Sequence, residues 1–126
     1  AFPGVRLGGY DVNPSAIAFG RERLVDISFR VADFREATPA PADVILSCYA
    51  LCYCPPENLD TVLRGLRVAA KKGLVLAEPL PPPEGLIPDL PYPEWRHPYQ
   101  HYLPGSSVIP MPKIDRLDGA VVFTPM

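Results

Sequence analysis

The chain has 126 residues, of which 48% are hydrophobic and 21% charged, and its net charge is −2. These values suit one folded domain and exclude a wholly disordered chain and a coiled coil. The apolar runs are far shorter than the roughly 20 residues of a transmembrane helix, the first residues do not resemble a secretory signal, and no basic patch is visible, so we expect a cytoplasmic protein that binds neither membranes nor nucleic acids.

Strands and helices alternate over residues 1–78. Asn13 and Pro14 are a candidate N-cap and first helical position, and apolar residues recur at helical spacing after Pro55-Pro56. The run Val44-Ile45-Leu46 lacks alternation, which is typical of a strand covered on both faces. The predicted strands are 5–10, 27–32, 43–49 and 74–77, and the predicted helices are 15–23 and 57–72. This order predicts an α/β, Rossmann-like fold, with a mostly parallel sheet and helices on both faces.

Proline divides the rest of the chain. Eleven prolines fall within residues 79–112, which therefore cannot form a regular helix or a central strand. We interpret this part as an ordered excursion over the sheet edge, with a short helix near residues 94–103. Asp118-Gly119 is a strong turn signal, and it predicts an antiparallel hairpin within residues 113–126. All three parts, 1–78, 79–112 and 113–126, are expected to belong to a single domain.

Three cysteines, Cys48, Cys52 and Cys54, lie within seven residues. Their odd number argues against a disulfide framework, and their spacing differs from the C-x2-C of zinc sites. We interpret them as small apolar side chains in a reducing compartment, and we predict no metal site.

Polar residues follow three of the predicted strands. Asp11 follows the first, Asp33 the second, and Ser47-Cys48 ends the third. Ligands of open parallel sheets bind at the carboxyl ends of the strands, where one carboxylate can accept both hydroxyls of a ribose and a second can accept from the amino group of an adenine. Val12 or Phe34 could then stack on the ring. The alternative is that both aspartates only form turns or cap helices.

The segments around these residues, 9–23, 30–37 and 42–80, resemble class I S-adenosylmethionine-dependent methyltransferases. GYDVNPSAIAFGRER (9–23) resembles the second motif of that family, in which an acid ends the second strand. RVADFREA (30–37) is similar to the third motif, and residues 42–80 resemble the fourth strand, the following helix and the fifth strand. The resemblance covers about residues 4–80, and the order and spacing of the motifs make it moderately specific.

The resemblance implies S-adenosyl-L-methionine as the cofactor and assigns residues to its parts. Asp11 would bind the ribose and Asp33 the adenine amino group. The other implied contacts are Val12 and Phe34 on either side of the adenine, and Ser47 and Cys48 beside the methionine moiety.

At one motif this chain departs from the pattern of the family. Its glycine-rich turn should precede Asp11 by about twenty residues, but only ten stand there, and PGVRLGG (3–9) leads into a strand and not into a helix. In this family the first strand lies at the centre of the sheet, between the second and the fourth. Either residues before Ala1 supply it, which we favour, or the chain is a degenerate relative that closes its sheet differently.

Residues 91–103 combine aromatic side chains with both histidines, His97 and His101. The histidines are four residues apart and would share a helix face if Pro98 allows it. We predict that one of them is a catalytic base in an acceptor pocket with an aromatic floor, because methyl transfer to O or N often requires removal of a proton. The alternatives are an aromatic cluster that seals the sheet edge and, with less support, a zinc site without a third ligand.

The sequence therefore predicts methyl transfer from S-adenosyl-L-methionine to an O, N or C nucleophile of a small molecule. The alternative is a non-catalytic methyltransferase-like binding or scaffold domain that lacks the glycine loop. A nucleotide-binding dehydrogenase is a third interpretation, since acids bind ribose there too, but the predicted antiparallel C-terminal strand argues against it.

Overall fold

The computed structural model describes residues 3–80, 95–109 and 120–123. The chain divides into two compact units, residues 1–37 and residues 38–126, and each is described by itself. Among the described residues, no helix is long and apolar enough to cross a membrane.

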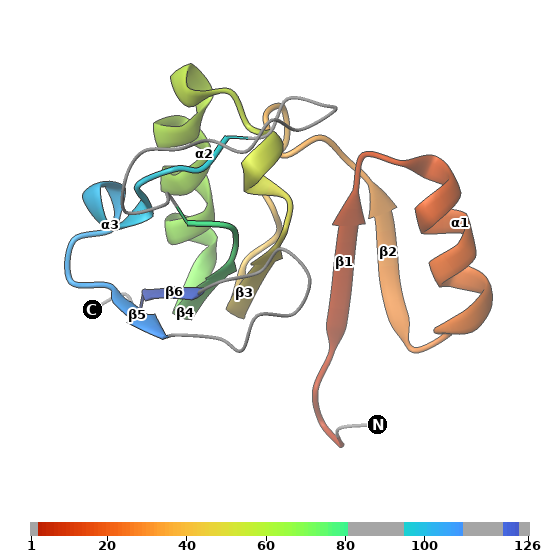
Figure 1. Cartoon of the computed structure of the whole chain (residues 1–126). Coiled ribbons are helices and arrows are strands. Elements are labelled where there is room, and N and C mark those ends of the chain that lie inside the picture. The colour runs from red at the N-terminus through yellow and green to blue at the C-terminus, as the bar shows by residue number, and fades with distance from the viewer. Residues whose placement is uncertain (1–2, 81–94, 110–119, 124–126) are drawn as a thin grey trace. The chain divides into compact units, whose positions relative to one another are not determined.

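The first unit is one βαβ unit (Figure 1). Strand β1 (Leu7–Asp11) and strand β2 (Ile27–Val31) pair in parallel, and helix α1 (Pro14–Arg23) connects them. The helix begins as predicted: Pro14 is its first residue, and the Asn13 side chain accepts hydrogen bonds from the amides of Ser15 and Ala16. A Cβ at Gly9 would lie 2.8 Å from the ring of Phe29, so a larger residue there would force this ring to shift.

The second unit is built on a four-stranded sheet. Its strands are β3 (Ala42–Cys48), β4 (Ala70–Ala77), β5 (Ser107–Ile109) and β6 (Ala120–Phe123), in the order β3-β4-β6-β5. β3 and β4 are parallel, whereas β6 is antiparallel to both of its neighbours. The predicted α/β class, the parallel pairs and the antiparallel C-terminal strand are therefore confirmed.

The core of the second unit lies between α2 (Pro56–Ala69) and one face of its sheet (Figure 1). On the sheet, Leu74 and Leu76 are fully buried. The buried side chains of α2 are Leu59, Val62, Leu63, Leu66 and Ala69. On β3, Val44 is 58% and Leu46 63% exposed, so the prediction that this strand is covered on both faces is wrong. An unbroken apolar run shows that a strand can be buried, but not that a layer covers each of its faces.

Helix α2 ends three residues earlier than the sequence predicts. Ala70 is both its C-cap and the first residue of β4, and it pairs with Ala42 of β3. Lys71 and Lys72, which resemble a basic helix end, therefore lie in the strand, and Lys72 Nζ forms a 2.8 Å salt bridge with Asp43. Helix and strand follow each other without a loop, so no turn residue marks the boundary.

The proline-rich part contains one short helix and one short strand among its described residues. Helix α3 (Tyr99–Tyr102) lies within the predicted range, and β5 follows it. β5 is the antiparallel partner of β6. The predicted turn at Asp118-Gly119 and residues 113–117 of the predicted hairpin lie outside the described residues.

Candidate functional site

Two acidic residues lie at the carboxyl ends of the parallel strands of the first unit. Asp11 is the last residue of β1 and pairs in register with Val31 of β2. The Ala32 amide donates to the Asp11 carbonyl at 3.0 Å, and Asp33 follows directly. Because the two strands are parallel neighbours, both acids reach the same sheet edge. This edge is where open parallel sheets bind nucleotides.

Asp11 holds the turn into α1 while remaining exposed. Its Oδ1 accepts a 2.8 Å hydrogen bond from the Asn13 amide. A carboxylate offers about four acceptor positions on its two oxygens, so this bond leaves capacity for a diol. The neighbouring Val12 side chain is 64% exposed and can present an apolar surface to a ligand.

Asp33 is half-buried and is held by Arg35. The Arg35 guanidinium contacts both carboxylate oxygens, with Nη2 2.5 Å from Oδ2, and the Arg35 amide donates to Oδ1 at 2.9 Å. These side-chain and backbone hydrogen bonds lower the pKa of Asp33 below its usual value. Phe34, between the two, is also half-buried. Sequence reasoning missed Arg35, although an acid and an arginine two residues apart on a turn are a signal for such a pair.

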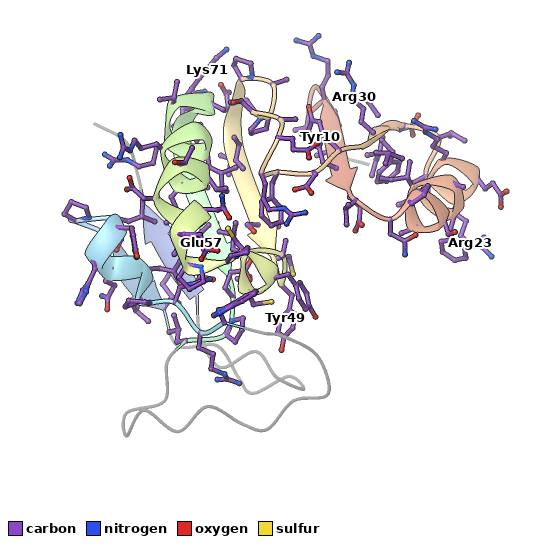
Figure 2. The ribbon with its side chains drawn as sticks, turned by 90° about the horizontal axis from the view of Figure 1, so that it is seen from above. Tyr10, Arg23, Arg30, Tyr49, Glu57 and Lys71 are labelled. Carbon is purple, nitrogen blue, oxygen red and sulfur yellow. The ribbon has the colours of Figure 1, made fainter. Side chains whose placement is uncertain are left out.

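In the second unit, the chain turns sharply away from the sheet after β3. The Ser47 hydroxyl donates to Glu78 Oε1 at 2.7 Å, whereas Cys48 is an exposed free thiol. Tyr49 has φ of 51°, a left-handed conformation that a non-glycine residue rarely adopts. Its amide donates to the Ala77 carbonyl at 2.9 Å, and its ring projects outward from the turn (Figure 2).

Glu78 is fully buried directly after β4. Its Oε1 accepts from the amides of Ala50 and Leu51 at 3.0 and 3.1 Å, and its Oε2 accepts from the Cys52 amide at 3.3 Å. We call residues 47–54 the β3 turn; it includes the 3-10 helix η1 (Leu51–Tyr53). Glu78 is not among the site residues that the sequence predicts. An acid directly after an apolar strand, as at Asp11, was a signal for it.

The two histidines occupy different environments. His97 is buried, and its Nε2 lies 2.9 Å from the Cys54 carbonyl oxygen and 3.2 Å from that of Leu51, so Nε2 carries the proton and donates. Burial lowers the pKa of His97, although both backbone hydrogen bonds act in the opposite direction. His101 is exposed. They do not share a helix face, because α3 begins at Tyr99, after Pro98.

The aromatic residues of this segment have different surroundings. The Tyr99 ring is buried and meets the His97 ring edge-on, with 5.6 Å between their centroids. The Trp95 amide donates to the Cys52 carbonyl at 2.7 Å, so the segment is attached to the β3 turn. Tyr92 lies outside the described residues.

The three cysteines, all within the described residues, form no disulfide, and Cys52 and Cys54 are buried. Within residues 3–80, 95–109 and 120–123, no group of three or more His, Cys, Asp or Glu side chains could hold a metal ion.

Comparison with known proteins finds similar folds among solved structures. No family model and no curated protein matches the sequence. The S-adenosylmethionine-dependent methyltransferase SibL in its apo form aligns over 97% of this chain with a TM-score of 0.75 and 17% identity. The magnesium protoporphyrin IX methyltransferase ChlM from Synechocystis PCC 6803, with bound SAH, aligns over 96% with a TM-score of 0.69 and 16% identity. Human N-acetylserotonin methyltransferase in complex with SAM aligns over 95% with a TM-score of 0.67 and 16% identity.

These alignments show that the chain has the class I methyltransferase fold. The chain spans 44% of the SibL chain, 64% of the ChlM chain and 40% of the human enzyme. The resemblance that the sequence motifs indicate is thus confirmed at the level of the fold.

Proposed function

We propose that this chain takes part in methyl transfer from S-adenosyl-L-methionine to a small-molecule acceptor. The observation that carries the proposal is the pair of acids, Asp11 and Asp33, at the carboxyl ends of adjacent parallel strands. The fold, shared with methyltransferases solved with SAM or SAH, supports the same cofactor. These carboxylates are hydrogen-bond acceptors, which fits a ligand whose ribose diol and exocyclic amine are donors.

In this proposal each candidate residue has one role. Asp11 accepts from the ribose hydroxyls, and its exposed carboxylate supports that role. Asp33 accepts from the adenine amino group beside Arg35. Val12 and Phe34 contact the adenine ring, and Ser47 and Cys48 contact the methionine end.

The cofactor supplies an electrophilic methyl group, which an O, N or C nucleophile of the acceptor attacks while the sulfonium leaves as a thioether. Catalysis of this reaction depends mostly on proximity and orientation. An O–H or N–H acceptor must also lose a proton. His101 is the better candidate base, since its imidazole is exposed, whereas His97 donates from Nε2 to two carbonyls and could accept a proton only at Nδ1. Unchanged turnover in His101→Ala would remove it from this role.

A ligand screen on the complete protein tests the proposal. We expect S-adenosylmethionine and S-adenosylhomocysteine to raise the midpoint of thermal unfolding, because a ligand that binds only the native state stabilises it. NAD should leave the midpoint unchanged. A shift with NAD alone would support a dehydrogenase, and no shift with any of the three would support a non-catalytic domain.

A further inference from the structure

The backbone of the β3 turn is held from two sides by buried side chains. On one side, the Glu78 carboxylate accepts from the Ser47 hydroxyl and from three successive amides, those of Ala50, Leu51 and Cys52. All four donors are neutral, so peptide and hydroxyl dipoles hold the buried Glu78 carboxyl group in place.

The opposite side of the turn is held through its carbonyl oxygens. His97 Nε2 donates to the carbonyls of Leu51 and Cys54, and the Trp95 amide donates to that of Cys52. The turn is thus attached by its amides to the end of β4 and by its carbonyls to residues 95–97. A backbone with so many specific bonds has one preferred conformation.

This conformation includes the left-handed Tyr49. A residue with positive φ persists only where the surrounding structure holds it, and here the bonds of Tyr49 to Ala77 and of Ala50 to Glu78 lie on either side of it. Ser47 and Cys48, the last two residues of β3, stand directly before this reversal. In the proposed function, these residues face the methionine end of the cofactor.

We propose that Glu78 is a positioning residue for methyl transfer: it holds the β3 turn in the shape that binds the methionine end of the cofactor. Glu78 acts through the turn. The proposal rests on the proposed function, because it assigns part of the cofactor site to this turn.

The test compares Glu78→Gln with a control substitution outside the β3 turn, both made in the complete protein. Glutamine has nearly the same shape, but its amide NH₂ group donates hydrogen bonds and cannot accept them. In either orientation of the amide, this NH₂ group faces N–H or O–H donors of the turn, and the hydrogen bonds at that position are lost. The control is Val62→Ala, which removes two buried methyl groups of α2 and thereby lowers stability away from the turn. Affinity for S-adenosylhomocysteine is measured by calorimetry at a temperature where all variants are folded, and exchange of the amides of residues 50–52 is followed by NMR.

We expect Glu78→Gln to bind S-adenosylhomocysteine at least tenfold more weakly and to exchange these amides at least tenfold faster. Val62→Ala should bind like the wild type. If Glu78→Gln binds like the wild type, the positioning role is wrong while the proposed function stands. Equal losses of affinity in Glu78→Gln and Val62→Ala would also overturn the positioning role, because they would assign the effect to stability. If the wild type itself does not bind, the proposed function fails and the positioning role fails with it.

Discussion

Asp33 shows how a neighbouring residue decides what a side chain at a strand end can do. Its carboxylate accepts from the guanidinium and the amide of Arg35, which together occupy much of its capacity. The same contacts keep it ionised, since they lower its pKa. An adenine amino group would therefore share this carboxylate with Arg35. The aspartate thus both forms a turn and remains an acceptor, so the two interpretations of its role are compatible.

We predict that Asp33→Asn weakens binding of S-adenosylhomocysteine about fivefold, because one hydrogen bond of about 1 kcal/mol is lost. Arg35→Ala is the matched variant: it removes the competing cation and leaves the carboxylate, so affinity should stay within twofold of the wild type. Calorimetry on both variants makes the comparison. Wild-type affinity in a folded Asp33→Asn protein would leave the aspartate as a turn former only.

His97 predicts a pH dependence of stability. Burial lowers its pKa in the folded protein, so the unfolded chain, with a pKa of about 6.5, binds the proton more readily. The free energy of unfolding should therefore be constant above this value and fall as the pH decreases from about 6.5 toward the lower folded pKa. Asp33 and Asp43, whose pKa values are also lowered, titrate below this range.

Denaturant unfolding at pH 7.5, 6.5 and 5.5 measures the effect. The decline should be weaker in His97→Gln, whose side chain does not titrate, and should persist in His101→Gln, because His101 is exposed. An identical decline in the wild type and in His97→Gln would assign the pH dependence to other groups.

At the scale of elements, two turns use side-chain oxygens in related ways. At the start of α1, the Asn13 side chain accepts from the amides of Ser15 and Ala16 at 2.9 and 3.4 Å, and Asp11 accepts from the Asn13 amide. In the β3 turn, Glu78 accepts from three amides across 26 to 28 residues of sequence. The first arrangement is local and can be predicted from the sequence, whereas the second requires β3 and β4 to pair.

We predict that Asn13→Ala lowers the free energy of unfolding by about 1 kcal/mol, the usual effect of losing an N-cap. Asn13→Asp should retain most of the stability, since aspartate caps equally well. The control is Asn58→Ala in α2, where an exposed asparagine is replaced by a better helix former. Denaturant unfolding measures all three, and equal values for Asn13→Ala and Asn58→Ala would show that the cap contributes nothing.

For the whole molecule, local sequence patterns predicted the helices and strands, whereas contacts between residues far apart in the sequence decided the end of α2 and the partners of Glu78 and His97. The strands ending near Asp11 and Cys48 and the helix beginning at Pro14 follow from apolar runs, capping and proline. The strand that begins at Ala70 does not, because its pairing with Ala42 decides where α2 ends. The same holds for Glu78 and His97, whose hydrogen-bond partners lie 26 to 46 residues away in the sequence.

The last prediction concerns the stability of the complete protein with a bound ligand. A ligand at 100 times its Kd stabilises the native state by about 2.7 kcal/mol, provided that it does not bind the unfolded chain. Asp11 is proposed to accept two charge-assisted hydrogen bonds from the ribose, so Asp11→Ala should raise the Kd for S-adenosylhomocysteine at least 100-fold.

At the same ligand concentration, a 100-fold weaker Kd leaves only about 0.4 kcal/mol of stabilisation. Denaturant unfolding with and without S-adenosylhomocysteine measures how much the ligand raises the free energy of unfolding. This rise should be about 2 kcal/mol smaller in Asp11→Ala than in the wild type. Asp26→Ala is the control, because this acid lies between α1 and β2, near the start of β2 and not at its carboxyl end. If the ligand stabilises Asp11→Ala as much as it stabilises the wild type, Asp11 does not hold the ribose.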